Sequence, residues 1–131
     1  MALMETAYRP LSEYEASLLA RLLEVDFEGR DAMARQVQSV VVREIDDSGS
    51  IEFKVGDEAP RANVTQRVPI EGEASDEDGV PIWVMLFVID GKIDELEICK
   101  ADGTPIRRRP LARELEVFTY PPPKDGPQSA M

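Results

Sequence analysis

The fold is decided by one stretch of the chain, residues 82–100, which reads IWVMLFVIDGKIDELEICK. Its first eight residues are apolar without interruption, which is typical of a strand that is covered on both faces, or covered on one and paired with another chain. Asp90-Gly91 is then a strong signal for a two-residue turn, with Gly91-Lys92 as the alternative loop. After the turn, Leu96 and Ile98 alternate with Glu95, Glu97 and Cys99, which predicts a second, half-buried strand. The stretch therefore predicts a β-hairpin near the middle of a sheet.

The segment before residue 40 has the period of two amphipathic helices. Ser12 and Glu15 have the spacing of a capping box, in which each side chain satisfies an early backbone amide. Gly29 predicts a break after the first helix, because glycine readily takes a positive φ. Asp31 is expected to cap a second, shorter helix that runs to about Gln38. The inner faces are expected to hold Leu11, Tyr14, Leu18, Leu22 and Val25 in the first helix, and Met33, Ala34 and Val37 in the second.

Short runs rich in β-branched residues follow, separated by turn residues. Val40–Ile45 and Ile51–Val55 predict a hairpin around the polar turn at residues 46–50. Val64–Glu71 predicts a third strand, which should lie at an edge or carry a bulge because Pro69 cannot donate a ladder hydrogen bond. Residues 72–81 are expected to form an acidic loop.

These elements predict an α+β fold, with two N-terminal helices packed on one face of a roughly five-stranded, mainly antiparallel sheet connected as a meander. A single domain is expected over residues 9–117, after a frayed N-terminus at residues 1–8. Within it, residues 106–117 are expected to pack along the sheet or to form a short helix near Leu111–Leu115. Three consecutive prolines predict a disordered tail at residues 118–131.

The chain is strongly acidic, with 26 acidic and 15 basic residues and a net charge of −11. Residues 41–105 carry sixteen acidic and six basic residues, whereas residues 106–131 have a net charge of +2. Such a body repels phosphate backbones and anionic lipids, so neither nucleic acid nor a membrane is an expected partner. It attracts basic partners, although the same charge also serves solubility alone. A single cysteine, with no signal peptide and no apolar run of about 20 residues, predicts a cytoplasmic protein.

Catalytic and metal-binding chemistry is poorly supported, because the chain contains no histidine. Histidine is the usual base for Ser and Cys nucleophiles and a major ligand of zinc and haem. Cys99 shares a strand face with two glutamates, which raise the pKa of a thiol, so a passive thiol is expected. Asp76-Glu77-Asp78-Gly79 resembles part of a calcium loop, but Ala74 and Met85 stand where that loop needs its first and last ligands. A solvated acidic turn is the better account, and no metal or cofactor site is predicted.

Charged side chains remain as candidates for chemistry. Two carboxylates suffice for acid–base catalysis, but the sequence does not single out one pair among 26 acidic residues. Arg107, Arg108 and Arg109, joined by Arg113, form the one basic cluster of the sequence. Such a cluster binds an anion or an acidic partner. The alternative, which we favour, is that these arginines lie against the chain's own acidic sheet.

Several short motifs, taken in order, resemble an uncharacterised family of small acidic bacterial proteins, a domain of unknown function. The resemblance covers about residues 9–117 and implies one compact domain, without an established activity or site residues. Its motifs are Arg9-Pro10-Leu11, Leu18-Leu19, Leu22-Leu23, Asp46–Ser50, Arg67-Val68-Pro69-Ile70-Glu71, Asp76–Val80, Asp90-Gly91, Glu95-Leu96-Glu97-Ile98 and Asp102-Gly103.

The function predicted from these observations is a non-enzymatic acidic protein-binding module, similar to an immunity or inhibitor protein, that engages a basic partner. One alternative is a small enzyme or ligand-binding protein that uses carboxylates and arginines, which a deep pocket lined by such residues would favour. Another is a homodimer formed through the sheet, without a ligand. No catalytic residue is predicted, and the candidate binding residues are Asp76, Glu77, Asp78, Glu95, Glu97, Arg107, Arg108 and Arg109.

Overall fold

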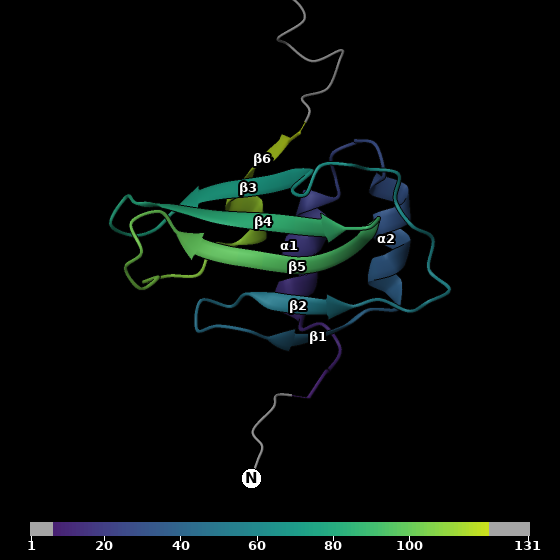
Figure 1. Cartoon of the computed structure of the whole chain (residues 1–131). Helices are drawn as coiled ribbons and strands as arrows, with labels where there is room; N and C mark the ends of the chain where they lie inside the picture. Colours follow the sequence, from purple (N-terminus) through teal and green to yellow (C-terminus); the bar gives the residue numbers. More distant parts are fainter. Residues whose placement is uncertain (1–6, 121–131) are drawn as a thin grey trace, which may run out of the picture.

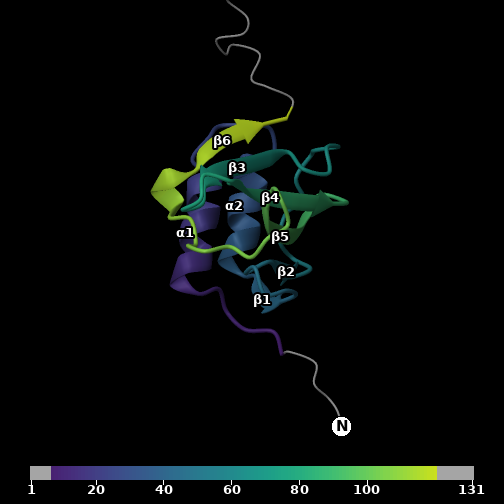
Figure 2. The same ribbon diagram turned by 90° about the vertical axis from the view of Figure 1, so that its left-hand side faces the viewer.

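The computed structural model describes residues 7–120, which form two α-helices, one short 3₁₀ helix and six strands. The strands build one antiparallel sheet in the order β1-β2-β5-β4-β3-β6. Both α-helices pack on the same face of this sheet, and no described helix covers the opposite face (Figures 1 and 2). The predicted α+β class, with N-terminal helices on one face of an antiparallel sheet, is confirmed.

The elements have the following bounds. The helices are α1 (Glu13–Leu22), α2 (Arg30–Gln38) and the 3₁₀ helix η1 (Ala112–Glu114). The strands are β1 (Val41–Glu44), β2 (Ile51–Lys54), β3 (Ile70–Ser75), β4 (Pro81–Ile89), β5 (Lys92–Lys100) and β6 (Glu116–Thr119). Neither α-helix is long and apolar enough to cross a bilayer.

Helix α1 begins at the predicted capping box. The Glu15 amide donates to Ser12 Oγ at 3.1 Å, and the Ser12 amide donates to Glu15 Oε1 at 2.9 Å. Arg9 donates two further hydrogen bonds to the buried Glu15 carboxylate, at 2.9 and 2.8 Å, and these lower the pKa of Glu15 against the effect of burial. Arg9 also exchanges backbone hydrogen bonds with Val42 of β1, at 2.8 and 2.7 Å. The start of the helix is thus joined to the outer edge of the sheet.

Helix α2 begins two residues earlier than predicted. Gly29, with φ +93°, is the N-cap, so Asp31 lies in the first turn instead of capping it. Met33 is buried as expected, but the other fully buried residue is Gln36. The Gln36 amide group donates to the carbonyls of Pro60 and Gly91, at 2.7 and 2.9 Å, and accepts from the Ile93 amide at 2.8 Å. A polar side chain therefore fixes α2 to the β4–β5 turn.

The β4–β5 hairpin lies at the centre of the sheet, as predicted. Asp90 and Gly91 both have positive φ, 56° and 80°, which is the geometry of a type I′ turn. Residues of β4 alternate between buried and half-buried, so only one face of this apolar strand is fully covered. The pairing register shifts next to Phe87, where β5 carries one extra residue, Asp94.

The prediction for the third strand was wrong in its position. Strand β3 begins at Ile70, after Pro69, and the acidic loop is limited to residues 76–80. Ile70, Gly72 and Ala74 alternate with two glutamates and a serine. The alternation is hard to recognise in the sequence, because Gly72 and Ala74 are too small to look like buried strand residues. A Cβ atom on Gly72 would lie 3.2 Å from the side chain of Leu115, so the small residue makes room for that leucine.

Strand β6 was not predicted, and it raises the strand number from five to six. It pairs antiparallel with β3, so β3 is not an edge strand. The predicted tail boundary at residue 118 falls inside β6, while residues 1–6 and 121–131 lie outside the described part of the chain. The chain is a meander only from β3 to β5, because β2 lies beside β5 and β6 beside β3.

The core lies between the helices and one face of the sheet. Leu18, Leu19 and Leu22 of α1 are buried against it, and Tyr14 and Arg21 hold α1 to the C-terminal segment by hydrogen bonds to the carbonyls of Pro110 and Leu115, at 2.7 and 2.9 Å. The sheet contributes its inward-facing residues, Val42, Ile51, Phe53, Ile70, Ala74, Ile82, Val84, Leu86, Val88, Ile93, Leu96 and Ile98.

Candidate interaction surface

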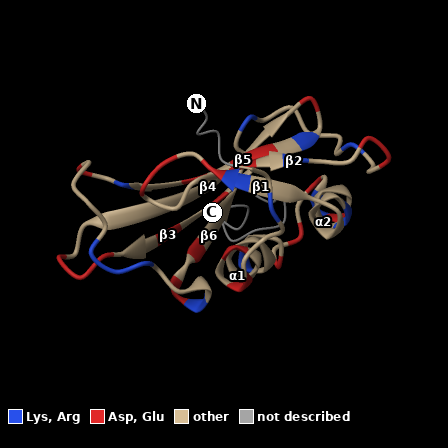
Figure 3. Cartoon of the chain, turned by 90° about the horizontal axis from the view of Figure 1, so that it is seen from below, with Lys and Arg blue, Asp and Glu red and all other residues tan. Residues whose placement is uncertain are grey.

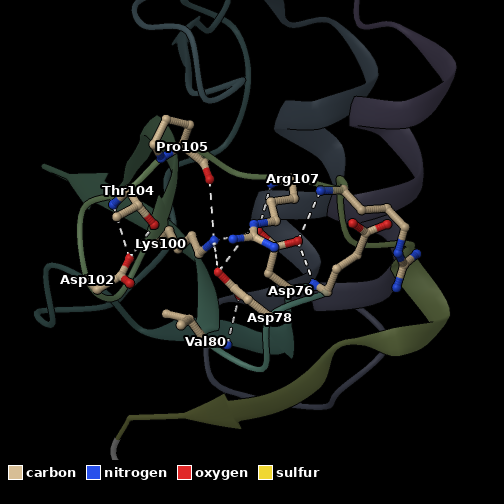
Figure 4. Close-up of polar contacts among 10 residues, drawn as sticks. Asp76, Asp78, Val80, Lys100, Asp102, Thr104, Pro105 and Arg107 are labelled. Atoms are coloured by element: carbon tan, nitrogen blue, oxygen red, sulfur yellow. Dashed lines mark hydrogen bonds and ion pairs between the residues drawn. The ribbon is translucent and has the colours of Figure 1, made fainter.

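Two of the predicted binding residues, Asp76 and Asp78, belong to an internal polar cluster (Figure 4). Asp76 begins the β3–β4 turn, and its buried carboxylate accepts hydrogen bonds from the amides of Arg107, Arg108 and Glu77, at 2.7, 3.0 and 2.7 Å. Lys100, buried at the end of β5, lies 2.9 Å from Asp76 and 2.7 Å from Asp78. These contacts fasten the β3–β4 turn to the segment that follows β5.

The electrostatics of this cluster are set by its hydrogen bonds. Burial opposes the charge on Asp76, but the amide of Arg107, the Lys100 ammonium and two further amides outweigh it and lower the pKa of Asp76. The hydrogen bond to Asp78 raises the pKa of Lys100, against the effect of burial. All three groups are therefore charged at neutral pH and are satisfied by one another.

The arginine run is exposed, and its contacts are with a turn and two helices instead of the acidic sheet that the sequence interpretation favoured. Arg107 lies 3.6 Å from Asp78, and Arg108 lies 3.1 Å from Glu114. The guanidinium of Arg109 lies over the ring of Tyr14, at 5.5 Å from the ring centre. The run therefore connects the C-terminal segment to the β3–β4 turn, to η1 and to α1.

Glu95 and Glu97 lie elsewhere, on the face of the sheet that no described helix covers, which we call the open face. On β5 they flank the central strand β4, with Glu97 opposite Met85 and Glu95 opposite Phe87. On the other side of β4, Glu71 is opposite Met85 and Glu73 is opposite Trp83. We call Glu71 and Glu73 of β3, together with Glu95 and Glu97 of β5, the glutamate rows.

An apolar stripe runs between the glutamate rows. Between the rows it consists of Trp83, Met85 and Phe87, which are half-buried and project from β4 on the open face; beyond the rows the exposed Ile89, opposite Lys92, follows on the same face. The indole N–H of Trp83 donates to Glu73 at 3.3 Å. Aromatic and methionine side chains in the centre with charged residues around them are typical of a protein-binding surface.

The glutamate rows have no cationic partner within the described part of the chain. No Lys or Arg of residues 7–120 forms an ion pair with any of the four side chains. Burial and the charge of Glu97, followed by other acidic neighbours, raise the pKa of Glu95. Burial and the charges of Glu97, Asp46 and Glu71 likewise raise the pKa of the Cys99 thiol, as the sequence analysis expected. These groups experience one negative field across the open face.

The β1–β2 end of the open face is different, because its charges are paired. Arg43 donates to Glu52 at 2.6 Å, and the ring of Tyr8 lies under the Arg43 guanidinium and the Lys54 ammonium, at 4.8 and 5.4 Å. The β1–β2 end therefore differs from the glutamate rows, which make no ion pair with a described Lys or Arg. Acidic residues also lie on loops and helices around the molecule (Figure 3).

Two open hollows lie outside the open face, on either side of Arg109. One, of about 380 Å³, is lined by Arg9, Tyr14 and Glu15 among others, and the other, of about 350 Å³, by Ser48 and Thr104 among others. Arg9 and Glu15 already pair with each other there. Within residues 7–120, no three acidic or cysteine side chains gather closely enough to hold a metal ion.

The structure thus divides the predicted binding residues. Asp76, Asp78 and Arg108 are engaged internally, Glu77 is exposed at the tip of the β3–β4 turn, and Glu95 and Glu97 lie on the open face. Sequence reasoning missed Glu71 and Glu73, because the sequence predicts that the third strand ends at Glu71 and that residues 72–81 form a loop, whereas both glutamates lie within β3. The signal was present as the alternation of these glutamates with Ile70, Gly72 and Ala74.

Comparison with known proteins agrees with the resemblance seen in the sequence. No curated protein and no solved structure matches the chain. A family model described as a domain of unknown function (DUF6984) matches residues 8–110, which extend from the segment before α1 to Pro110 and include the glutamate rows and the Asp76 cluster. Because the match covers most of the 131 residues, the chain belongs to the DUF6984 family of unknown function.

Proposed function

We propose that this protein is a non-enzymatic binding module, comparable in role to an immunity or inhibitor protein, and that its open face engages a basic protein partner. One observation carries the proposal: an apolar stripe on a sheet face that no described helix covers, bordered on both sides by glutamates that form no ion pair with a Lys or Arg of residues 7–120. Apolar contacts would supply affinity, and the glutamate rows would supply specificity and fast association.

The energetics of the open face support this role. Four carboxylates around one stripe repel one another, and Glu95 lies directly opposite Glu52 on β2. Like charges in such cross-strand positions destabilise a sheet. These glutamates lower the stability of the free protein by repelling one another. A basic partner would relieve this repulsion on binding, so the arrangement favours binding of positive charge.

The contrast with the Asp76 cluster also supports it. There, every carboxylate has a lysine, arginine or amide partner, so the charges hold the fold together. Within residues 7–120, basic residues thus pair with the acids of this cluster, and none pairs with the glutamate rows. An enzyme built on carboxylates and arginines would need these groups to converge on a substrate, whereas Asp76, Asp78 and Arg108 are occupied by one another or by their neighbours.

Affinity capture tests the proposal with two charge-matched variants. The rows variant carries Glu71→Gln, Glu73→Gln, Glu95→Gln and Glu97→Gln. The control variant carries Glu13→Gln, Glu28→Gln, Asp47→Asn and Glu58→Gln, which are exposed and lie outside the open face. Each variant loses four negative charges, so any difference between them reports on the position of the charges and not on net charge.

The expected result is that wild type and the control variant retain the same basic proteins from a lysate of the source cells, whereas the rows variant loses them. Capture should weaken as salt is added, because the interaction is partly electrostatic. Circular dichroism and thermal unfolding would establish that the rows variant is folded. Equal capture by all three proteins, or capture of neutral and acidic proteins alone, would contradict the proposal.

A further inference from the structure

We infer that the part of the partner that lies on the open face is an amphipathic α-helix with Lys or Arg on both sides of its apolar stripe. This inference rests on the proposed function and adds the form of the partner. It is carried by the dimensions of the apolar stripe, the separation of the glutamate rows and the position of both at the centre of the sheet.

The apolar stripe has the length of two helical turns. Trp83, Met85 and Phe87 are alternate residues of one strand, so they follow one another at about 6.7 Å and span about 13 Å. Residues at i, i+4 and i+8 of an α-helix follow one another at about 6 Å and span about 12 Å along its axis. Three apolar side chains on one side of a helix can therefore contact the three members of the stripe in turn.

The glutamate rows have the separation of the two flanks of a helix. They lie on β3 and β5, one strand to either side of β4, and are thus about 9.6 Å apart. An α-helix with side chains is about 10–12 Å wide, so a helix centred over β4 places the residues on its two flanks above the two rows. The register supports this, because Met85 has a glutamate on both sides, Glu71 and Glu97. Lysine or arginine on each flank would pair with them.

An extended segment fits this surface less well. A peptide that binds as an added strand needs a free sheet edge, and β4 lies two strands from the nearest edge, that of β6. At the other edge, Arg9 already exchanges backbone hydrogen bonds with Val42 of β1. A strand lying on the open face would direct its side chains toward the stripe in a single line and would leave the glutamate rows unpaired.

A second copy of this chain is also a poor occupant. Two open faces in contact would bring a second set of glutamate rows into a dry interface, where unpaired charges of one sign are destabilising. The described open face carries the bases Arg43 and Lys54 at its β1–β2 end, where Glu52 and Tyr8 already contact them, and Lys92 beside the β4–β5 turn, 3.9 Å from Asp57. Charge complementarity therefore favours a basic partner of a different sequence.

The test uses three synthetic peptides of about 16 residues, a length that permits helix formation on binding. The first contains leucine and lysine with leucine at helical period, so that lysines flank an apolar stripe. The second has the same composition with strictly alternating leucine and lysine, which favours an extended strand. The third has the helical pattern with glutamate in place of lysine. Trp83 is the one tryptophan of the chain, so its fluorescence reports contact with the stripe directly.

The helical lysine peptide is expected to bind about tenfold or more tightly than either other peptide, and to gain helical circular dichroism on binding. Glu71→Gln with Glu97→Gln should lower its affinity about three- to tenfold, because two rim ion pairs are lost. The matched pair Glu28→Gln with Glu58→Gln should leave the affinity unchanged. Thermal unfolding of each variant would confirm that it is folded.

Two outcomes would overturn the helical form of the partner while leaving the proposed function in place. One is equal affinity for the helical and alternating lysine peptides, with both lost in the rows variant. The other is capture of basic proteins that depends on the glutamate rows but is not displaced by the helical peptide. A dimer seen by sedimentation, with Trp83 fluorescence shielded from a quencher, would overturn both the helical form of the partner and the proposed function. Affinity for the helical peptide that does not depend on the glutamate rows would also overturn both.

Discussion

At the scale of single residues, the structure gives two aspartates and four glutamates of one acidic chain opposite roles. Asp76 accepts three amide hydrogen bonds and pairs with the buried Lys100. Asp78 completes the lysine's contacts. The glutamate rows make no ion pair with any described residue. The difference is decided by which side chains the chain places within hydrogen-bond distance, since the residue types are chemically alike.

The substitution Asp76→Asn is expected to lower the melting temperature by on the order of 10 °C, because Lys100 then loses a buried anionic partner and the Asn amide group meets backbone amides. The lowered pKa of Asp76 predicts a pH dependence of this loss. Stability from Asp76 is fully present above the ordinary Asp pKa of about 4 and disappears as the pH falls through the lower folded value. Thermal unfolding from about pH 3 to pH 8 should therefore show a constant difference above about pH 5 that narrows in acid.

The neighbouring Glu77 provides the control, because its side chain is exposed at the tip of the same turn. Glu77→Gln should change the melting temperature by about 1 °C or less, as for most surface substitutions. An equal loss for both variants would mean that the turn itself, and not the buried carboxylate, holds this end of the sheet.

Glu95→Gln is expected to stabilise the protein by about 0.5 kcal/mol at neutral pH, because it removes a charge that lies opposite Glu52. The pKa of Glu95 is raised, so the folded state is penalised above that folded pKa. The penalty decreases as the pH falls toward the ordinary Glu value of about 4.3 and is absent below it. Urea unfolding should show wild type and variant diverging at neutral pH and converging near pH 4. A destabilised variant at neutral pH would show that Glu95 stabilises the fold.

At the scale of elements, the β4–β5 hairpin is held by its turn and by what packs against that turn. The Gly91 carbonyl accepts from the Ala62 amide at 2.8 Å and from Gln36 at 2.9 Å. The long connection from β2 to β3 and helix α2 are therefore both attached to the same two-residue turn.

Gly91→Ala is expected to destabilise the protein by about 2 kcal/mol or more, for two reasons. An alanine at φ +80° is strained by about 1–2 kcal/mol, and its Cβ would lie 2.7 Å from the Ala62 carbonyl oxygen. Gly79→Ala is the matched control, because Gly79 has φ +83° but no described atom within 4 Å of the added Cβ. Urea unfolding should show the smaller loss for Gly79→Ala. Equal losses would mean that the connection at Ala62 moves away freely.

At the scale of the whole molecule, the net charge of −11 is distributed unevenly over paired and unpaired sites. Raising NaCl from about 20 mM to about 500 mM shortens the screening length from roughly 20 Å to 4 Å. The melting temperature of wild type is expected to rise by about 2–5 °C, because repulsion among the glutamates is screened. The rows variant should rise less than the control variant of equal net charge. A fall in melting temperature with salt would show that the paired charges dominate.

The sequence by itself determined the helices, the two hairpins and the acidic class of the protein. Each of these depends on local patterns: a capping box at Ser12, alternating residues on β5, and a two-residue turn with positive φ at Gly91. Such patterns act between residues close in the chain, so they can be read without knowing what packs where. All of these patterns lie within residues 8–110, which the family model matches.

The tertiary structure decided which strands are neighbours in the sheet and which charged side chains form ion pairs. Strand β3 contains two small residues, Gly72 and Ala74, in a segment that the sequence predicts as a loop. Gly72 is small because the side chain of Leu115, which is distant in sequence, packs against it. Asp76 and Lys100 are 24 positions apart, so no local pattern indicates that they form an ion pair. Glu71 and Glu97 lie on opposite sides of β4, and no local pattern indicates that neither forms an ion pair with a described residue. Contacts of this kind depend on the packing of segments distant in sequence, and that packing distinguishes the acids that hold the fold from those left at its surface.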